Sequence, residues 1–80
     1  MRATEIDFSK TELTEINDFA FSECLELKKI GFPDKLNKFG EHSFEDCINI
    51  DNITIPNSIM FLNKYLFNRC LKLKSIQFPK

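Results

Sequence analysis

The sequence predicts a solenoid of the α/β class, mostly β, and three observations support this prediction. First, the chain repeats itself with a period of 23 residues in the segments 13–35, 36–58 and 59–80. Second, the aligned positions share residue types as well as polarity. Third, polar and apolar residues alternate toward the end of each repeat, which is the period of a half-buried strand. A fixed period of this length is typical of architectures in which each unit buries its apolar face against the next.

The repeats account for almost the whole chain, so we expect a single domain over residues 1–80. Residues 1–12 read as the end of an earlier, partial repeat, with Ile6 and Phe8 at the positions of Ile30 and Phe32. No linker and no change of composition marks a second domain.

Each repeat is expected to run from a short extended piece through a turn into a strand. In the first repeat, Asp18–Cys24 is predicted to form either a compact turn or a single helical turn, capped by Asn17 or Asp18. The strand follows at Lys29–Phe32 and ends at Pro33, because proline has no N–H for a sheet. Equivalent strands then form a short parallel sheet along one side of the stack, and the turns or single helical turns lie on the other side.

Two expectations concern the core. Phe44 should be the most deeply buried aromatic residue, because Phe21 and Phe67 occupy the same repeat position on either side of it. Leu25 and Leu27 should both pack beneath the turn of the first repeat.

Charge is spread unevenly along the chain. The net charge is −1, but residues 59–80 contain five bases and no acid, whereas residues 1–58 carry a net charge of −6. A solvated surface explains this separation, and attraction between opposite ends of stacked copies explains it as well, so head-to-tail self-association is an alternative. The five positive charges of residues 59–80 lack an aromatic platform on which bases could stack, so nucleic-acid binding is not expected. No segment approaches the ~20 apolar residues of a membrane span, so no membrane insertion is expected.

The three cysteines, Cys24, Cys47 and Cys70, share one repeat position, which favours small buried core side chains. Stacked side chains ~4.8 Å apart point the same way, which is a poor orientation for a disulfide. With His42 as the only histidine, they do not form a zinc-ligand set.

His42 suggests a nucleophilic pair with Cys47, but the repeat argues against it. His42 shares its repeat position with Phe19 and Tyr65, which favours an aromatic surface position instead. We therefore expect no catalytic, metal or cofactor-binding residues, no cofactor and no enzyme activity.

The strand alternation identifies a candidate partner-binding surface. If Ile30 and Phe32 face the core, the residues between and before them face outward. The outward residues of the four predicted strands are polar, and we expect a protein partner on this face. The candidate partner-binding residues are Glu5, Asp7, Lys29, Asn52, Thr54, Ser75 and Gln77.

The repeats resemble the BspA-type class of leucine-rich repeats. The phrases that carry the resemblance are AFSEC, SFEDC and LFNRC, followed by LELKKIGFP, INIDNITIP and LKLKSIQFP. The resemblance implies a curved leucine-rich-repeat solenoid with the strands, and so the expected partner-binding face, on its concave side. It also implies a role in adhesion or protein–protein binding without catalytic residues. The alternative function is a fragment or assembly unit of a longer array that stacks end to end.

Two locations follow from these expectations. The N-terminal segment has no apolar run of the kind found in signal peptides, which predicts a cytoplasmic location for the chain as it stands. A fragment of a protein typical of the family would instead belong to the cell surface or be secreted.

Overall fold

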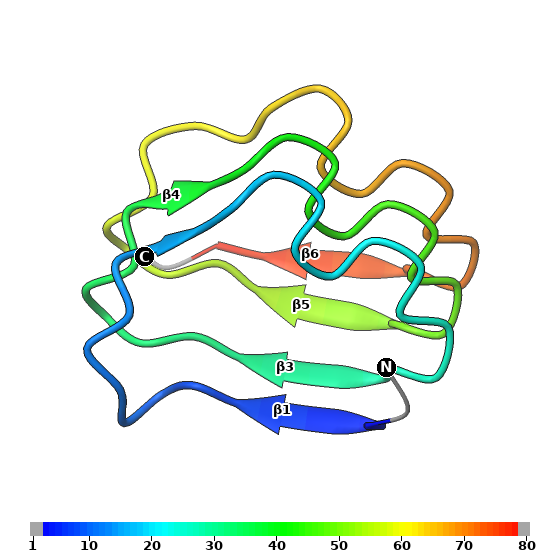
Figure 1. The fold of residues 1–80 in the computed structure, drawn as a ribbon, viewed down its shortest axis with the longest axis horizontal. Helices are drawn as coiled ribbons and strands as arrows, with labels where there is room; N and C mark the ends of the chain where they lie inside the picture. Colours follow the sequence, from blue (N-terminus) through cyan, green and yellow to red (C-terminus); the bar gives the residue numbers. More distant parts are fainter. Residues whose placement is uncertain (1–2, 79–80) are drawn as a thin grey trace.

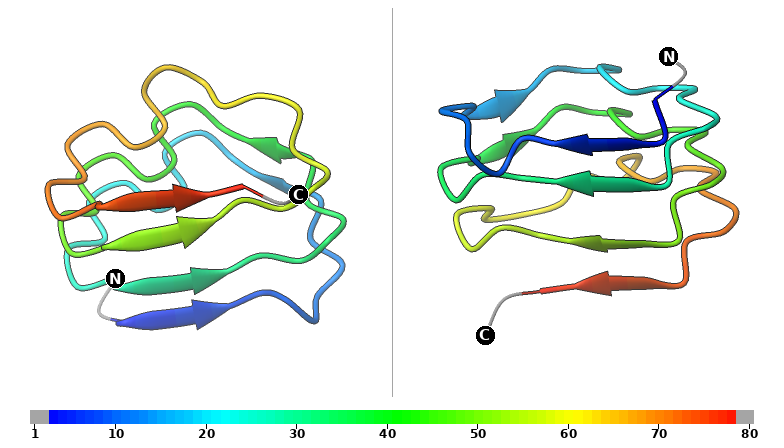
Figure 2. Two further views of the ribbon diagram at one scale, coloured as in Figure 1. Left: turned by 180° about the vertical axis from the view of Figure 1, so that it is seen from behind. Right: turned by 90° about the horizontal axis from the view of Figure 1, so that it is seen from below.

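A computed structural model describes residues 3–78 of the chain. Four short strands lie side by side in the order β1 (Glu5–Asp7), β3 (Lys29–Gly31), β5 (Asn52–Thr54) and β6 (Ser75–Gln77) (Figure 1). Two further strands, β2 (Glu15–Ile16) and β4 (Lys38–Phe39), lie on a different side of the coil (Figures 1 and 2). The paired strands are β1 with β3, β2 with β4, and β5 with β6, and each pair is parallel. The prediction of a mostly β chain with short parallel sheets is confirmed.

The sequence period sets the register of the strand pairs. Ile53 lies opposite Ile76, 23 residues later, and Ile16 lies opposite Phe39 at the same separation. The pair of Ile6 with Ile30 spans 24 residues, which matches the one additional residue in the turn that follows β1. Side-chain hydrogen bonds also join neighbouring repeats, since the Asn49 amide donates to a backbone carbonyl oxygen 24 residues earlier at 2.6 Å.

The segment opposite the strands is a series of turns, and no helix occurs among residues 3–78. The helical component of the predicted α/β class is therefore wrong, and the compact turn is the correct alternative for Asp18–Cys24. Alternate N–H groups explain the difference. Those of Ala20, Ser22 and Cys24 bond three residues back within the turn, whereas those between them bond to the next repeat. A helix needs all of these donors for its own bonds.

Positive φ angles interrupt the turns at regular positions and also exclude a helix. They fall at two repeat positions, at Phe19 (φ 60°) and His42 (φ 58°), and at Glu23 (φ 61°), Asp46 (φ 62°) and Arg69 (φ 62°). None of these residues is glycine, so the neighbouring repeats hold the backbone in a conformation that costs roughly 1–2 kcal/mol per residue.

The core lies between the strands and the turns. Phe44 is fully buried and is the largest such side chain, which confirms its expected place. Its ring stacks on Phe21 at 5.4 Å and on Phe67 at 5.9 Å between centroids. The expected packing of Leu27 is confirmed, because it is fully buried.

The same expectation for Leu25 is wrong, because half of its surface is exposed. Leu25 lies two residues after the left-handed residue Glu23, and Cys24 between them is buried. Leu71 occupies the same repeat position and is also exposed.

Within residues 3–78, no helix is long and apolar enough to cross a membrane.

Candidate functional site

The seven residues expected to bind a partner all lie exposed on β1, β3, β5 and β6. Their side chains alternate with the inward isoleucines at the strand centres. We call this surface the strand face, which consists of Glu5, Asp7, Lys29, Gly31, Asn52, Thr54, Ser75 and Gln77.

The strand face carries both charges and neutral polar groups. Glu5 lies opposite Lys29, so the first two strands place unlike charges side by side. On the last two strands, the Thr54 hydroxyl donates to the Gln77 amide oxygen at 3.2 Å. The surface therefore offers hydrogen-bond donors and acceptors in rows that follow the repeat.

Gly31 leaves a gap in one of these rows. A Cβ atom at this position would lie 2.9 Å from the Asp7 Oδ1 atom, so the Asp7 carboxylate leans over the glycine. The Ser9 N–H donates to that oxygen at 2.8 Å, and hydrogen bonding by Ser9 lowers the pKa of the Asp7 carboxyl. A shallow cavity of about 370 Å³ begins at Gly31 and extends past Asp34 to Asn57.

A second surface feature is an aromatic ladder formed by Phe19, His42 and Tyr65. The centroids of Phe19 and His42 are 4.8 Å apart with nearly parallel rings, and those of His42 and Tyr65 are 4.7 Å apart. Lys64 Nζ lies 5.0 Å from the Tyr65 ring centroid. The shared repeat position of these three residues predicted an aromatic surface position for His42, but it did not predict that the three rings stack.

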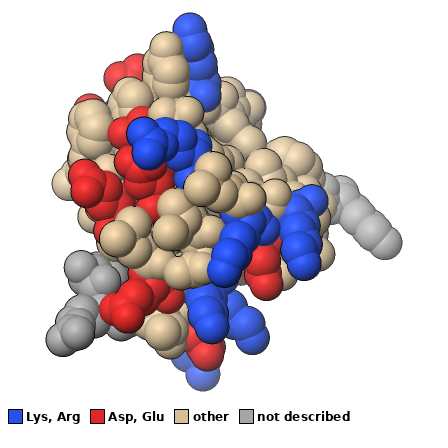
Figure 3. All heavy atoms as spheres, turned by 90° about the vertical axis from the view of Figure 1, so that its right-hand side faces the viewer, with Lys and Arg blue, Asp and Glu red and all other residues tan. Residues whose placement is uncertain are grey.

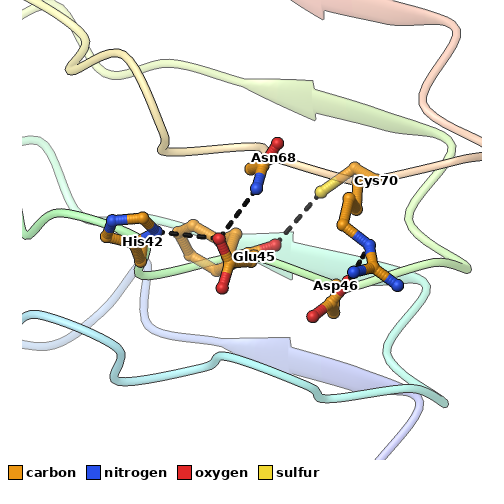
Figure 4. A network of polar contacts seen from close by, with 7 residues as sticks. His42, Glu45, Asp46, Asn68 and Cys70 are labelled. Atoms are coloured by element: carbon orange, nitrogen blue, oxygen red, sulfur yellow. Dashed lines mark hydrogen bonds and ion pairs between the residues drawn. The ribbon is translucent and has the colours of Figure 1, made fainter.

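Glu45 holds the centre of the ladder in place. Its Oε1 atom lies 2.8 Å from His42 Nδ1 and accepts a hydrogen bond from the Asn68 amide at 2.8 Å (Figure 4). The hydrogen bond from Asn68 lowers the pKa of the Glu45 carboxyl most, and the contact with His42 lowers it further. Next to it, Arg69 Nε pairs with Asp46 Oδ1 at 2.8 Å. The contacts of Asn68 and Arg69 therefore join the third repeat to the second (Figure 4).

All three cysteine thiols are free, and those of Cys47 and Cys70 donate to the backbone of the preceding repeat. Cys47 Sγ lies 3.0 Å from the Phe21 carbonyl oxygen, and Cys70 Sγ lies 3.1 Å from that of Phe44. Burial raises the pKa of the Cys47 thiol to about 12 and that of Cys70 to about 11. A nucleophilic cysteine needs the opposite shift, because the thiolate is the reactive form.

The two ends of the array differ in polarity and in charge. Residues 3–27 contain seven carboxylates and one lysine, whereas residues 59–78 contain three lysines, one arginine and no acid. On the face drawn in Figure 3, most acidic side chains lie in one half and most lysines and arginines in the other. Five of the seven most exposed large apolar side chains belong to the last repeat: Met60, Phe61, Tyr65, Leu71 and Phe78.

Within the described residues, no group of three or more His, Cys, Asp or Glu side chains has the arrangement of a metal site.

A comparison with protein families decides the identity of the repeats. The model of the BspA type leucine rich repeat region, described with six copies, matches residues 2–80. The chain belongs to this family. This match confirms the resemblance of the repeated sequence phrases to BspA-type leucine-rich repeats. No curated protein and no solved structure matches the chain at a significant level.

Membership of the BspA-type leucine-rich repeats has a functional consequence at a coarse level. The family suggests a repeat-type scaffold for protein interaction, and it is generally non-enzymatic. The strand face and the ends of the array are the surfaces on which such a role would depend.

Proposed function

We propose that the chain is a non-catalytic scaffold of the leucine-rich-repeat solenoid type, which holds a protein partner on its strand face as the concave side. The observation that carries this proposal is the set of exposed polar side chains repeated along β1, β3, β5 and β6. Repeating rows of donors and acceptors suit an extended partner that contacts several repeats at once. Adhesion at a cell surface is the form of this function that the family suggests.

The absence of activated groups at the strongest chemical candidates supports a non-catalytic role. The Cys47 thiol is fully buried and its pKa is raised, so it does not supply a thiolate near neutral pH. The His42 ring is engaged by two aromatic rings and Glu45.

A charge placed on the strand face tests the binding role. Thr54→Arg adds a bulky cation at the centre of the face, and Asn37→Arg adds the same cation at an exposed position before β4. We expect proteins captured by the wild-type chain to be lost with Thr54→Arg and retained with Asn37→Arg. Equal retention by both variants would contradict binding at this face.

The charge separation favours a second candidate function, an assembly unit that stacks end to end. Opposite charges at the two ends attract over about 10 Å at 0.1 M salt, so the association should weaken as salt rises. Mass in solution, measured across concentration at low and high salt, tests this function. A constant monomer mass under all conditions would contradict it.

A further inference from the structure

The outer side of the last repeat has the composition of an interface. Met60 is 86% exposed, Phe61 73% and Phe78 62%. They line a cavity of about 370 Å³ whose remaining walls are Ile55, Pro56, Asn57, Ile59 and Leu62. Apolar side chains gathered at one site in this way commonly mark an interaction surface.

The strand beside this cavity has a free edge. Among residues 3–78, β6 pairs only with β5, and β1 pairs only with β3. Each of these outermost strands has three residues with an isoleucine at its centre, Ile6 in β1 and Ile76 in β6. Unpaired strand edges readily accept another strand, and β1 already forms the required parallel pair with β3.

Charge selects which edges meet. The end that carries β6 has Lys64, Arg69, Lys72 and Lys74 without an acid, so two such ends repel one another. The end that carries β1 has the acids Glu5 and Asp7 on the strand itself. Unlike charges favour β6 of one copy against β1 of another and disfavour contact between two identical ends.

We propose that β6 of one copy pairs in parallel with β1 of a second copy, with Ser75 opposite Glu5, Ile76 opposite Ile6 and Gln77 opposite Asp7. This register continues the one seen between β5 and β6 and between β1 and β3. The inference deepens the end-to-end assembly described above and rests on it. It names the interface, the order of the strands and the partner, which is another copy of this chain.

The exposed apolar residues fit this arrangement. Four strands line one side of the array, but only three turn segments lie opposite them, at residues 18–23, 41–46 and 64–69. When β6 of one copy pairs with β1 of the next, the turn segment 64–69 of the first copy and 18–23 of the second are therefore two strand spacings apart. This distance is about 10 Å, and interdigitating side chains can fill it. Met60 and Phe61 on one copy, with the exposed Phe19 and Leu25 on the other, supply those side chains.

Chemical cross-linking between two single-cysteine variants tests the register, because stacked thiols on neighbouring parallel strands lie close together but are poorly oriented for a direct disulfide. Ser75→Cys and Glu5→Cys are made separately in chains whose three native cysteines are alanine, and each variant is first checked for folding by circular dichroism. The two are then mixed with a short bismaleimide, which joins neighbouring thiols without requiring disulfide geometry. We expect a mixed dimer that forms faster than either homodimer and less readily at high salt. A Ser75→Cys homodimer as the main product would overturn the head-to-tail order.

A matched control separates this interface from random collision. Asn52→Cys places its thiol at the same repeat position as Ser75, but on the inner strand β5, so it should not form the mixed dimer with Glu5→Cys.

If the native cysteines cannot be removed without unfolding, Lys74→Glu in the natural chain is tested in place of the cross-linking. It should weaken self-association about tenfold at low salt, and Lys38→Glu, remote from both edges, should not. If the chain associates but the mixed dimer does not form, or Lys74→Glu does not weaken the association, this interface is wrong and the assembly function remains. Absence of any association would overturn the assembly function as well.

Discussion

The second and third repeats carry nearly the same apolar pattern but bury it to different extents. Phe44, Cys47 and Ile53 are at most 1% exposed, whereas Phe67, Cys70 and Ile76 at the same positions remain half-buried. The contrast is greatest at the end of the strand, where Ile55 is 2% exposed and Phe78 is 62% exposed. The residue type therefore does not decide burial in this fold. At these positions, the presence of a neighbouring repeat on both sides decides it.

This difference has an energetic consequence. A side chain in the second repeat contributes contacts to both neighbours, and its counterpart in the third contributes to one. Stability in repeat arrays is approximately a sum of such nearest-neighbour contacts. Matched substitutions at equivalent positions in the two repeats should therefore differ in cost, even where the chemical change is identical.

The largest difference is expected between Phe44→Ala and Phe67→Ala. Truncation of the fully buried Phe44 should lower the free energy of unfolding by about 3–5 kcal/mol, because a cavity forms between two stacked rings. Truncation of half-buried Phe67 should cost about 1–2 kcal/mol, since less surface leaves contact. Urea unfolding followed by circular dichroism measures both. If Phe44→Ala leaves too little folded protein, Phe44→Leu against Phe67→Leu gives the same ranking, and equal costs would contradict the account.

Two glycines give the next contrast. A Cβ atom at Gly40 would lie 2.3 Å from the Asp18 nitrogen and 2.4 Å from the Asn17 carbonyl carbon, and neither backbone atom can move freely. Gly40→Ala should therefore cost about 3 kcal/mol or more. At Gly31 the nearest atom belongs to the exposed Asp7 side chain, which can rotate away, so Gly31→Ala should cost less than about 1 kcal/mol. Thermal unfolding of the two variants distinguishes these outcomes, and a similar loss in both would show that Asp7 is held as firmly as backbone.

Much of the fold could be predicted from the sequence, because its causes are local and periodic. The position of Ile53 in a 23-residue repeat predicts both its strand and the partner of that strand. The absence of helix could not be predicted in the same way. It depends on the N–H groups of Phe21 and Glu23, which bond to the second repeat and are therefore lost to the turn. Spacing in one repeat contains no information about donors used by another.

The candidate surfaces were predictable to a smaller extent. Alternation placed Thr54 and Gln77 outward, and both are exposed. The stacking of His42 between Phe19 and Tyr65 occurs with φ angles near 60° at Phe19 and His42, which few non-glycine residues adopt. The exposure of Leu25 could not be predicted either. Hydrophobicity does not indicate it, because Leu25 is half exposed whereas Leu27, the same residue type two positions later, is fully buried.

The thiols offer a comparison that depends on pH. The folded chain raises the pKa of Cys47 to about 12 and of Cys70 to about 11, above the ordinary value of 9.0. Below pH 9 both thiols are protonated in the folded and unfolded states, so their contribution to stability is complete. Above pH 9 only the unfolded chain loses these protons, and stability should fall by about 1.4 kcal/mol per pH unit for each thiol, until the pH reaches the folded pKa.

Melting temperatures at pH 8 and pH 10 measure this effect. Replacement of Cys47 by alanine should remove part of the loss between the two pH values, and replacement of both Cys47 and Cys70 should remove more. An alkaline loss that is unchanged in the double variant would assign it to other groups, such as the lysines.

The smallest expected effect concerns the left-handed turn residues. Glu23 is exposed and has φ 61°, so Glu23→Gly removes backbone strain and should leave stability unchanged or raise it by about 0.5–1 kcal/mol. Asp46 has nearly the same φ but pairs with Arg69 in the next repeat, so Asp46→Gly removes a contact together with the strain. It should therefore be less favourable than Glu23→Gly by up to about 1 kcal/mol. Glu26→Gly, at an exposed turn position without positive φ, should cost about 0.5–1 kcal/mol and serves as the control. Chemical denaturation resolves these steps, and a loss in Glu23→Gly equal to that in Glu26→Gly would show that the left-handed conformation at Glu23 carries no strain.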